Sequence, residues 1–332
     1  MQILRYFLFP ISILLFTCTT SRQSILEEDK TSLIQRRIAI IPKGNTHSYW
    51  KSVHAGAGKA AQELNVDLIW QGPAQEDGQQ MQISTVQKFV ADGVDAIVLA
   101  PLNEQALAPP VRAAAKRNIP VIIIDSDLQS PDFQSFIATD NLLGGKLSAR
   151  HLCEQLGGKG KVIMLRFRVG SASTTARETG FLAGIREHGP AIELLSTNEY
   201  AGVTVAEAMK VSQKILRKYP QATGIFTPTE TSTQGMLQAL QMEGRAGKVR
   251  FVGFDFNTTL LQALEKGQIH GLAVQDPFRM GYEGIRTAVA ILNQQPYEKR
   301  IDTGIMIVTK DNLTDPAVRE LLNPDLNKWL KE

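Results

Sequence analysis

Short apolar runs alternate with amphipathic segments along most of this chain. Nine runs, most of them continuously apolar and rich in β-branched residues, follow one another after residue 37. Strands that are covered by helices on both faces of a sheet have this composition. The predicted strands are 38–41, 66–70, 96–100, 120–125, 136–140, 161–166, 224–228, 250–255 and 271–275.

The segments between the runs carry apolar residues at helical spacing. Positions i, i+3 and i+7 form one stripe on a helix, and three triples have this spacing. They are Ile83, Val86 and Val90, then Ala208, Val211 and Ile215, and finally Ile285, Ala288 and Leu292. Strands that alternate with helices predict an α/β fold with doubly wound parallel sheets.

Ligands of such sheets bind beyond the carboxyl ends of the strands. The residues that follow the predicted strands are rich in aromatics, carboxylates, amides and arginine, and poor in histidine and cysteine. This mixture favours a polar uncharged ligand over metal chemistry. The segments are 42–50, 100–101, 125–126, 166–177, 228–230, 255 and 275–276.

Composition narrows the class of protein further. The chain has 332 residues, 43% of them hydrophobic and 21% charged, which are ordinary values for a globular protein. This length predicts two domains. A formal net charge of +3 gives no support to a nucleic-acid binder. Two cysteines exclude a disulfide framework or a thiolate metal cluster.

The first residues predict export. Arg5 precedes an apolar run at 6–16, which is too short to span a bilayer and is typical of a secretory signal. Residues 1–18 are interpreted as a signal peptide and 19–36 as a polar tether; a buried N-terminal element is the alternative. Leu-Phe-Thr-Cys at 15–18 resembles a lipobox, which predicts lipidation of Cys18 and an anchor to the membrane. A simple cleaved signal competes, because the two residues before Cys18 are not both small.

Motifs for catalysis or nucleotide binding are weak. Residues 56–61 match G-x-G-x-x-A, but this stretch begins well after its strand. We therefore expect it inside the first helix, where small residues allow close packing. The sequence has no P-loop, no nucleophile elbow and no H-E-x-x-H. We predict neither an enzyme, a metal site nor a cofactor.

Several residues that follow the predicted strands have either a structural or a ligand-binding role. Tyr49 and Trp50 are either core residues or a platform for a sugar ring. Asp125 and Asp255 either cap helices or accept hydrogen bonds from ligand hydroxyls. Arg177 is either a solvated helix residue or a planar donor over a ligand. Cys153 is expected to be a small buried hydrophobe.

These residues, in this order, resemble the periplasmic sugar-binding proteins of the ribose-binding type. The resemblance extends from about Arg37 to Asn323. It rests on VIIIDSDL (121–128), FIATDNLLGGKL (136–147), GSASTTARETGF (170–181), the segment 251–288 and the aromatic pair at 49–50.

The resemblance implies a type I periplasmic binding protein, with two similar lobes joined by three crossover strands. The crossovers would fall near 139–140, 275–276 and 302. Lobe one would contain 37–139 and 276–302. Lobe two would contain 140–275 and 303–325.

The resemblance also implies the ligand contacts. The matching positions are His47, Tyr49, Trp50, Asp125, Arg177, Thr229, Asp255 and Gln275, and further candidate cleft residues are Ser126, Arg166, Arg168 and Glu230. His47 and Thr229 lie where the family often has asparagine. Ser126 and Ala100 replace an arginine and an asparagine of the ribose binder, which argues against ribose itself. If Arg166 and Arg168 both faced the cleft, an anionic ligand would become an option.

The implied function is capture of a small sugar or polyol and its delivery to the permease and ATPase of an ABC importer. The protein would be a monomer in the periplasm or on the outer face of the membrane. A ligand sensor for a chemoreceptor or histidine kinase is the alternative. Repressors of the same fold carry an N-terminal helix-turn-helix, whereas this chain begins with the predicted export signal.

Overall fold

The computed structural model describes residues 1–2 and 35–330, and its strands form two six-stranded sheets. In spatial order, sheet one contains β11 (Arg300–Asp302), β5 (Ser135–Ala138), β4 (Val121–Ile124), β3 (Ala96–Leu99), β1 (Arg36–Ile41) and β2 (Val66–Trp70). Sheet two contains β12 (Ile305–Val308), β10 (Gly271–Gln275), β9 (Arg250–Phe254), β8 (Gly224–Phe226), β6 (Lys159–Arg166) and β7 (Ala191–Tyr200). Residues 3–34, which contain all but the first two residues of the predicted signal peptide, Cys18 and most of the predicted tether, lie outside the described residues.

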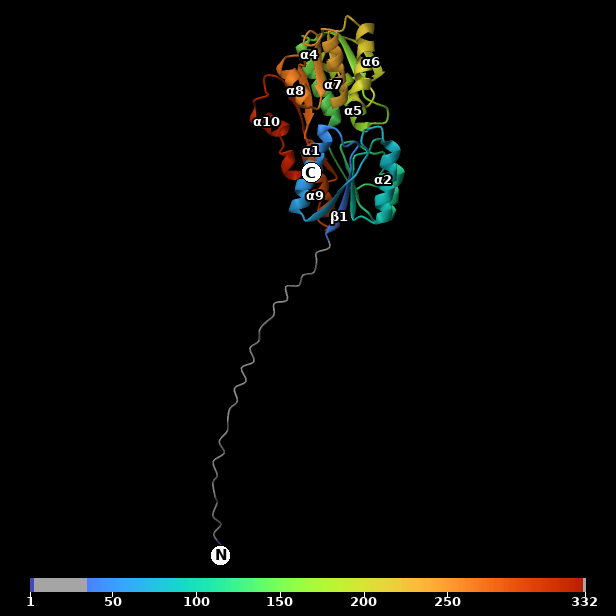
Figure 1. The fold of residues 1–332 in the computed structure, drawn as a ribbon, viewed down its shortest axis with the longest axis vertical. Helices are drawn as coiled ribbons and strands as arrows, with labels where there is room; N and C mark the ends of the chain where they lie inside the picture. Colours follow the sequence, from blue (N-terminus) through green and yellow to red (C-terminus); the bar gives the residue numbers. More distant parts are fainter. Residues whose placement is uncertain (3–34, 331–332) are drawn as a thin grey trace. The chain divides into compact units, whose positions relative to one another are not determined.

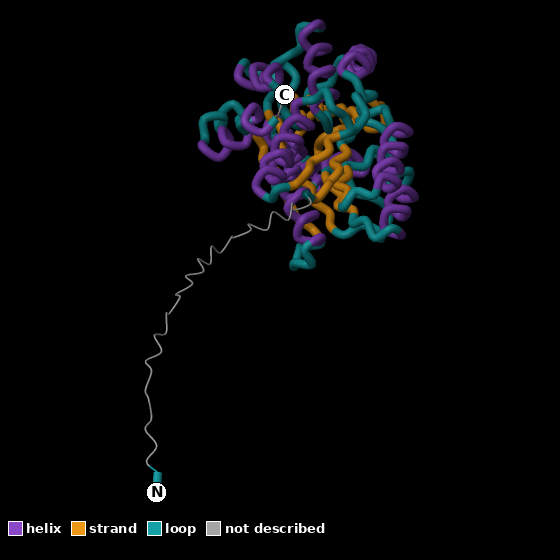
Figure 2. The backbone as a smooth tube through the Cα atoms, turned by 60° about the horizontal axis from the view of Figure 1, so that its bottom comes forward, coloured by secondary structure: helices purple, strands orange, loops and turns teal. Residues whose placement is uncertain are grey.

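Helices cover both faces of each sheet, and each sheet with its helices is called a lobe here (Figures 1 and 2). In lobe one, α1 (Ser48–Glu63) and α9 (Pro277–Leu292) cover one face, and α2 (Gln79–Asp92) and α3 (Ala108–Lys116) cover the other. In lobe two, α4 (Asn141–Gln155) and α5 (Ala172–His188) lie opposite α6 (Val205–Lys218), α7 (Glu230–Met242), α8 (Thr258–Glu265) and α10 (Pro316–Leu322). The doubly wound α/β fold with two lobes is confirmed.

The chain passes between the lobes at three places. It leaves sheet one after β5 and enters lobe two at α4. It returns after β10 to form α9, and it crosses again between β11 and β12. The first and third passages are bonded to each other, because the amides of Asp140 and Gly304 both donate to Asp302 Oδ1, at 3.2 and 2.9 Å.

The direction of β12 follows from this connectivity. Every neighbouring pair in the two sheets is parallel except β10 and β12. β11 runs toward the crossing edge of sheet one, and only the two residues 303–304 separate it from β12. The chain therefore enters sheet two at its carboxyl edge and runs against the other strands.

All nine predicted strands are present, and the three helical stripes lie on α2, α6 and α9. Three strands were not predicted, each for a physical reason. β7 lies at the edge of sheet two, and within it Ser196 alone is buried, so its sequence has no continuous apolar run. β11 has only three residues, and β12 follows it almost without a gap.

The end of the chain returns to lobe one. α10 packs in the lobe-two core through Val318 and Leu322. The short helix α11 (Leu326–Trp329) instead contacts α1. A Cβ built on Gly58 of α1 would lie 2.7 Å from the Trp329 carbonyl oxygen. The segment from α10 to α11 therefore links the two lobes as well.

The G-x-G-x-x-A stretch lies inside α1, as predicted, and brings α1 against α9. A Cβ built on Gly56 would lie 1.9 Å from the carbonyl oxygen of Phe278, and one on Gly281 would lie 1.9 Å from that of Val53. Backbones this close leave no room for a side chain at either glycine. The motif therefore packs two helices and does not form a turn around phosphates.

We expect Gly56→Ala to lower the free energy of unfolding by about 3 kcal/mol, because the added methyl group forces two helix backbones apart. Lys51→Ala, on an exposed position of the same helix, should change it by less than about 0.5 kcal/mol. Denaturant unfolding of both variants measures the difference. Equal stabilities would contradict the packing role of the motif.

Candidate functional site

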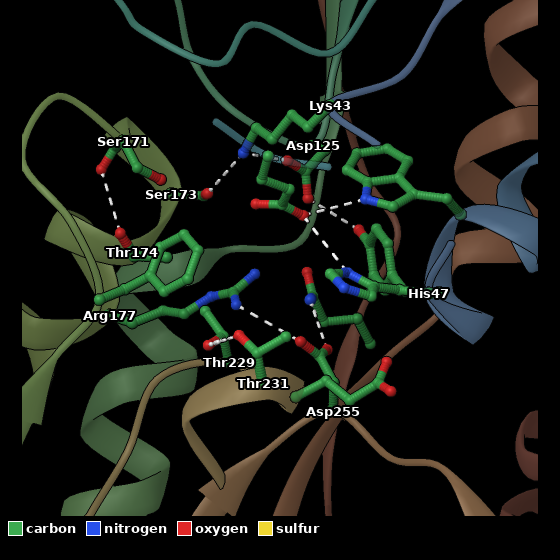
Figure 3. Close-up of a pocket in the computed structure, with 16 residues that line it drawn as sticks. Lys43, His47, Asp125, Ser171, Ser173, Thr174, Arg177, Thr229, Thr231 and Asp255 are labelled. Atoms are coloured by element: carbon green, nitrogen blue, oxygen red, sulfur yellow. Dashed lines mark hydrogen bonds and ion pairs between the residues drawn. The ribbon is translucent and has the colours of Figure 1, made fainter. Parts of the chain in front are cut away.

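A cavity lies where the strand ends of the two sheets meet (Figure 3). It encloses about 430 Å³ of space that protein atoms do not fill, part of it open to solvent. Nine residues named from the sequence line it: His47, Tyr49, Trp50, Asp125, Arg177, Thr229, Glu230, Asp255 and Gln275.

Two aspartates occupy equivalent places in the two lobes. Asp125 follows β4 and Asp255 follows β9, and both have a left-handed backbone, with φ of 63° and 61°. Such values are uncommon outside glycine, although aspartate tolerates them better than most residues. Neither residue caps a helix: α4 begins well after Asp125, and Asn257 caps α8. The left-handed turn instead leaves both carboxylates at the cavity wall.

In lobe one, Asp125 is held by a cation and a phenol. Lys43 Nζ lies 2.6 Å from Asp125 Oδ2, and the Tyr49 hydroxyl donates to Asp125 Oδ1 at 2.8 Å. Lys43 and Asp125 are each about 4% exposed, so the pair is almost completely out of water. A buried charge is tolerated only when it is paired and hydrogen-bonded, which both partners achieve here.

In lobe two, Arg177 and Gln275 hold Asp255. Arg177 Nη1 lies 3.7 Å from Asp255 Oδ2, and Gln275 Nε2 donates to Asp255 Oδ1 at 2.7 Å. Arg177 also donates to Asn141 Oδ1 and to the carbonyl of Pro228, and its guanidinium lies 4.0 Å from the centre of the Phe254 ring. Arg177 is therefore buried and fixed, which contradicts the reading of a solvated helix residue.

Burial changes the ionisation of the cavity groups. It raises the pKa of Asp255 to about 6, and the nearby Arg177 guanidinium opposes this increase. Burial also raises the pKa of Glu230 and that of Tyr49, the latter with a further contribution from the charge of Asp125. Tyr49 therefore stays protonated, and its hydroxyl donates a hydrogen bond to Asp125.

Two further carboxylates lie on the lining. Glu76 accepts a hydrogen bond from Trp50 Nε1 at 3.0 Å, and His47 Nδ1 lies 3.9 Å from the same oxygen. Glu230 accepts from Asn257 at 2.9 Å and from the Ser48 hydroxyl, across the cleft, at 3.2 Å. Carboxylates thus outnumber the lysine and arginine of this lining by four to two.

Apolar surface comes from aromatic rings on both sides. Trp50 is 2% exposed and packs edge to face on Tyr49, with ring centres 5.0 Å apart. Phe167 contributes from lobe two and is equally buried. The aromatic pair thus belongs both to the core of lobe one and to the cavity wall, so its two readings are compatible.

Three of the predicted cleft residues do not line the cavity. Arg166 is paired with Glu178 at 2.6 Å and packs over the Tyr200 ring. The Arg168 guanidinium donates to the carbonyl oxygen of Glu76. Ser126 is buried, and its hydroxyl accepts from the Ser173 amide at 3.0 Å. The condition for an anionic ligand, two arginines facing the cleft, is therefore not met.

Some polar atoms of the lining have no protein partner. Among the described residues, Ser171 Oγ and Gln275 Oε1 are buried side-chain atoms without a hydrogen bond. Both residues line the cavity and are about 2% exposed. Because unpaired buried polar atoms are costly, these two atoms are available to bond a polar ligand or water in the cavity.

Sequence reasoning missed several residues of the lining. Lys43 lies in the segment 42–50 after β1. The sequence analysis selected this segment but did not name Lys43 as a contact. Glu76 follows β2 in a loop that was not among the segments chosen. Seven lining residues were not predicted as contacts: Lys43, Glu76, Phe167, Ser171, Ser173, Thr174 and Thr231.

Residues 1–2 and 35–330 contain neither a metal-binding cluster nor a membrane-spanning helix. No group of three or more His, Cys, Asp or Glu side chains there is arranged to hold a metal ion. None of the helices in that part of the chain is both long enough and apolar enough to cross a membrane. Cys153 is buried and its burial raises the pKa of the thiol, as expected for a small core residue.

The fold and the interlobe cavity define a two-lobed ligand-binding protein. A model of the periplasmic binding protein domain matches residues 38–296, so the chain belongs to the periplasmic binding protein family. This family comprises transport and binding proteins and is not a family of enzymes.

Curated relatives and solved structures agree with this assignment. The ribose import binding protein RbsB of Escherichia coli is 26% identical over 277 residues, which cover 82% of this chain and 90% of the relative. A xylitol-binding protein of Mycolicibacterium smegmatis is 26% identical over 79% of this chain and 74% of its own length. A carbohydrate transporter solute-binding protein from Agrobacterium radiobacter, solved with D-arabinose, is 35% identical with a TM-score of 0.85, covering 88% of this chain and 100% of that chain.

The raised pKa of Asp255 predicts a pH dependence of stability. Between about pH 4 and pH 6 the folded protein holds a proton at this carboxyl that the unfolded chain has lost, so the stability it contributes falls as the pH rises. We expect the stability of Asp255→Asn relative to the natural protein to increase by roughly 2 kcal/mol from pH 4 to pH 7. Denaturant unfolding at both values measures it, and a constant difference would contradict the shift.

Proposed function

We propose that this protein binds one small uncharged sugar or polyol in the interlobe cavity and delivers it to an ABC importer, without chemical change to the ligand. One observation carries this function: hydrogen-bond donors and acceptors from both lobes converge with aromatic surface on one buried cavity. A polyol offers hydroxyls that donate and accept together with an apolar ring face, so it complements such a wall.

Each cavity residue has a defined role toward the ligand in the proposed complex. Asp125, Asp255 and Gln275 accept hydrogen bonds from ligand hydroxyls, and Arg177 donates. Tyr49 and Trp50 provide the aromatic surface on the lobe-one side. His47, Thr229 and Glu230 complete the polar wall. Charged groups form the stronger hydrogen bonds, so we expect the two aspartates to contribute most to affinity.

The relatives support the class of ligand. Solved neighbours have been determined with bound D-arabinose and D-fucose, and curated relatives are named for ribose, allose and xylitol. The charge of the lining agrees with a neutral ligand. Ser126 and Ala100, which stand where the ribose binder has an arginine and an asparagine, favour a sugar other than ribose.

We further propose the lobe boundaries and the cellular location that the sequence predicts. Lobe one would comprise 37–139 and 276–302, and lobe two 140–275 and 303–325. Residues 1–18 would direct export, the tether at 19–36 would follow, and the mature protein would act as a monomer in the periplasm or, through a lipid on Cys18, at the outer face of the membrane. Mass spectrometry of the N-terminus of the exported protein decides between a cleaved signal and a lipidated cysteine.

A thermal-shift panel tests the function. The panel contains D-arabinose, D-fucose, D-ribose, D-allose and xylitol, with glycine and L-glutamate as representatives of another ligand class. A bound sugar at 100 times its Kd should add about 2.7 kcal/mol of stability. Stabilisation by the amino acids alone would overturn the assignment to sugars, and a product formed from a bound sugar would overturn the non-enzymatic role.

Asp125→Asn tests the principal contact. The amide keeps the shape of the side chain but lacks the charge, so we expect affinity for the bound sugar to fall roughly 10- to 100-fold while the protein stays folded. Isothermal titration calorimetry measures the loss. Asp127→Asn is the matched control, because Asp127 is exposed two residues away and accepts only from the Leu128 amide. Equal affinities of the two variants would remove Asp125 from the site.

A further inference from the structure

A second cavity adjoins the interlobe cavity. It encloses about 670 Å³ of space that protein atoms do not fill, part of it open to solvent. Tyr49, Asp255 and Gln275 line both cavities, so the two spaces meet at these three side chains. Asp255 and Gln275 are also proposed acceptors for the hydroxyls of the sugar. A ligand that bonds to them in the interlobe cavity therefore lies next to the second cavity.

The end of the chain forms part of the wall of the second cavity. Leu322, Pro324 and Leu326 line it. Leu322 packs in the lobe-two core at the end of α10, whereas α11 begins at Leu326 and contacts α1 of lobe one. The residues between the two helices therefore pass from one lobe to the other along one side of this cavity.

The second cavity is much less polar than the first. Four carboxylates, a lysine and an arginine line the interlobe cavity, whereas Asp255 is the only charged side chain that the described residues place around the second. Phe256 and Pro277 join the three residues of the chain end, so five of its eleven lining residues are apolar. Sugar hydroxyls would find few partners in this space, but an apolar group gains free energy when it leaves water to enter it.

Gln275, at the boundary between the cavities, has a free acceptor. Its Nε2 donates to Asp255 Oδ1 at 2.7 Å, but its Oε1 has no hydrogen-bond partner, and the residue is 2% exposed. A buried acceptor without a partner is costly. A ligand with a hydroxyl at this boundary and an apolar group beyond it would satisfy Gln275 and fill the second cavity.

We propose that the second cavity is a subsite for the apolar substituent of a glycoside, a sugar whose anomeric oxygen carries an alkyl group. This inference rests on the proposed function. The sugar ring occupies the interlobe cavity, and the substituent lies against the chain end. Attachment through the anomeric oxygen leaves the other hydroxyls of the sugar free to bond Asp125, Asp255 and Arg177. The C-terminal segment thereby selects among ligands that share one sugar ring.

A series of alkyl glycosides tests the subsite. The ligands are the methyl, ethyl and propyl glycosides of the four aldoses in the thermal-shift panel, each as both anomers. For one anomer of a bound aldose, we expect each added methylene group to strengthen binding roughly fourfold, because it is buried in the apolar cavity. Isothermal titration calorimetry with the full folded protein measures the affinities.

Variants of Leu326 locate the effect. The larger ring of Leu326→Trp fills the second cavity, so this variant should lose the gain along the series. It should bind the free sugar as the natural protein does, because Leu326 does not line the interlobe cavity. Leu326→Gln, which is similar in size but polar, should reduce the gain and keeps the test valid if the tryptophan variant fails to fold. Leu330→Trp is the matched control, because Leu330 lies in the same terminal segment but does not line the second cavity.

The outcomes separate this inference from the proposed function. If the natural protein binds no sugar or polyol of the panel, the proposed function is wrong, and the subsite falls with it. If the protein binds a panel ligand but no glycoside gains affinity from methyl to propyl, the subsite is wrong and the function stands. The subsite is also wrong if Leu330→Trp loses the gain as fully as Leu326→Trp. A gain that the Leu326 variants lose and Leu330→Trp keeps supports it.

Discussion

The carboxyl ends of parallel strands all lie at one edge of their sheet, and in this protein the carboxyl edges of two sheets surround one cavity. The positions of the charged cavity residues follow from this arrangement. Lys43 and Asp125 stand after strands of sheet one, and Asp255 stands after a strand of sheet two. The connections between the lobes follow the same geometry, because the chain passes from the carboxyl edge of one sheet directly into the other lobe. At the third connection it enters sheet two from that edge, so β12 runs antiparallel to β10.

The charges of the cavity are neutralised within lobes and not between them. Lys43 and Asp125 both belong to lobe one, and Arg177 and Asp255 both belong to lobe two. Every ion pair among residues 35–330 likewise lies within a single lobe. Separation of the lobes would therefore leave no buried charge without its partner, a situation that costs several kcal/mol in proteins (about 3–5). Opening of the lobes would therefore not carry the cost of an unpaired buried charge.

Periodicity predicted the fold and strand-end position the segments around the cavity, while the family resemblance supplied the nine named residues among the sixteen that line it. Both aspartates were found because each ends a strongly apolar strand, but the left-handed backbone that aims them at the cavity cannot be read from their identity. Lys43 and Glu76 were missed for a different reason. An isolated lysine or glutamate in a loop is usually solvated, and only the approach of the other strands and the opposite lobe buries these two. Local sequence carries no signal of that approach.

Arg166 and Arg168 show the reverse error: the sequence placed them among the candidate cleft residues, but they do not line the cavity. Arg166 and Arg168 lie close in sequence to the cleft loop, and a cleft that held both would attract an anion. In the folded protein, Arg166 pairs with Glu178 and Arg168 with a backbone carbonyl, so neither lines the cavity. The lining instead has four carboxylates against one lysine and one arginine. A carboxylate-bearing ligand would meet uncompensated like charge in a largely buried space, where repulsion is stronger than in water. The net charge of +3 for the whole chain therefore says nothing about the charge of the ligand, whereas the local balance of the cavity argues against an anion.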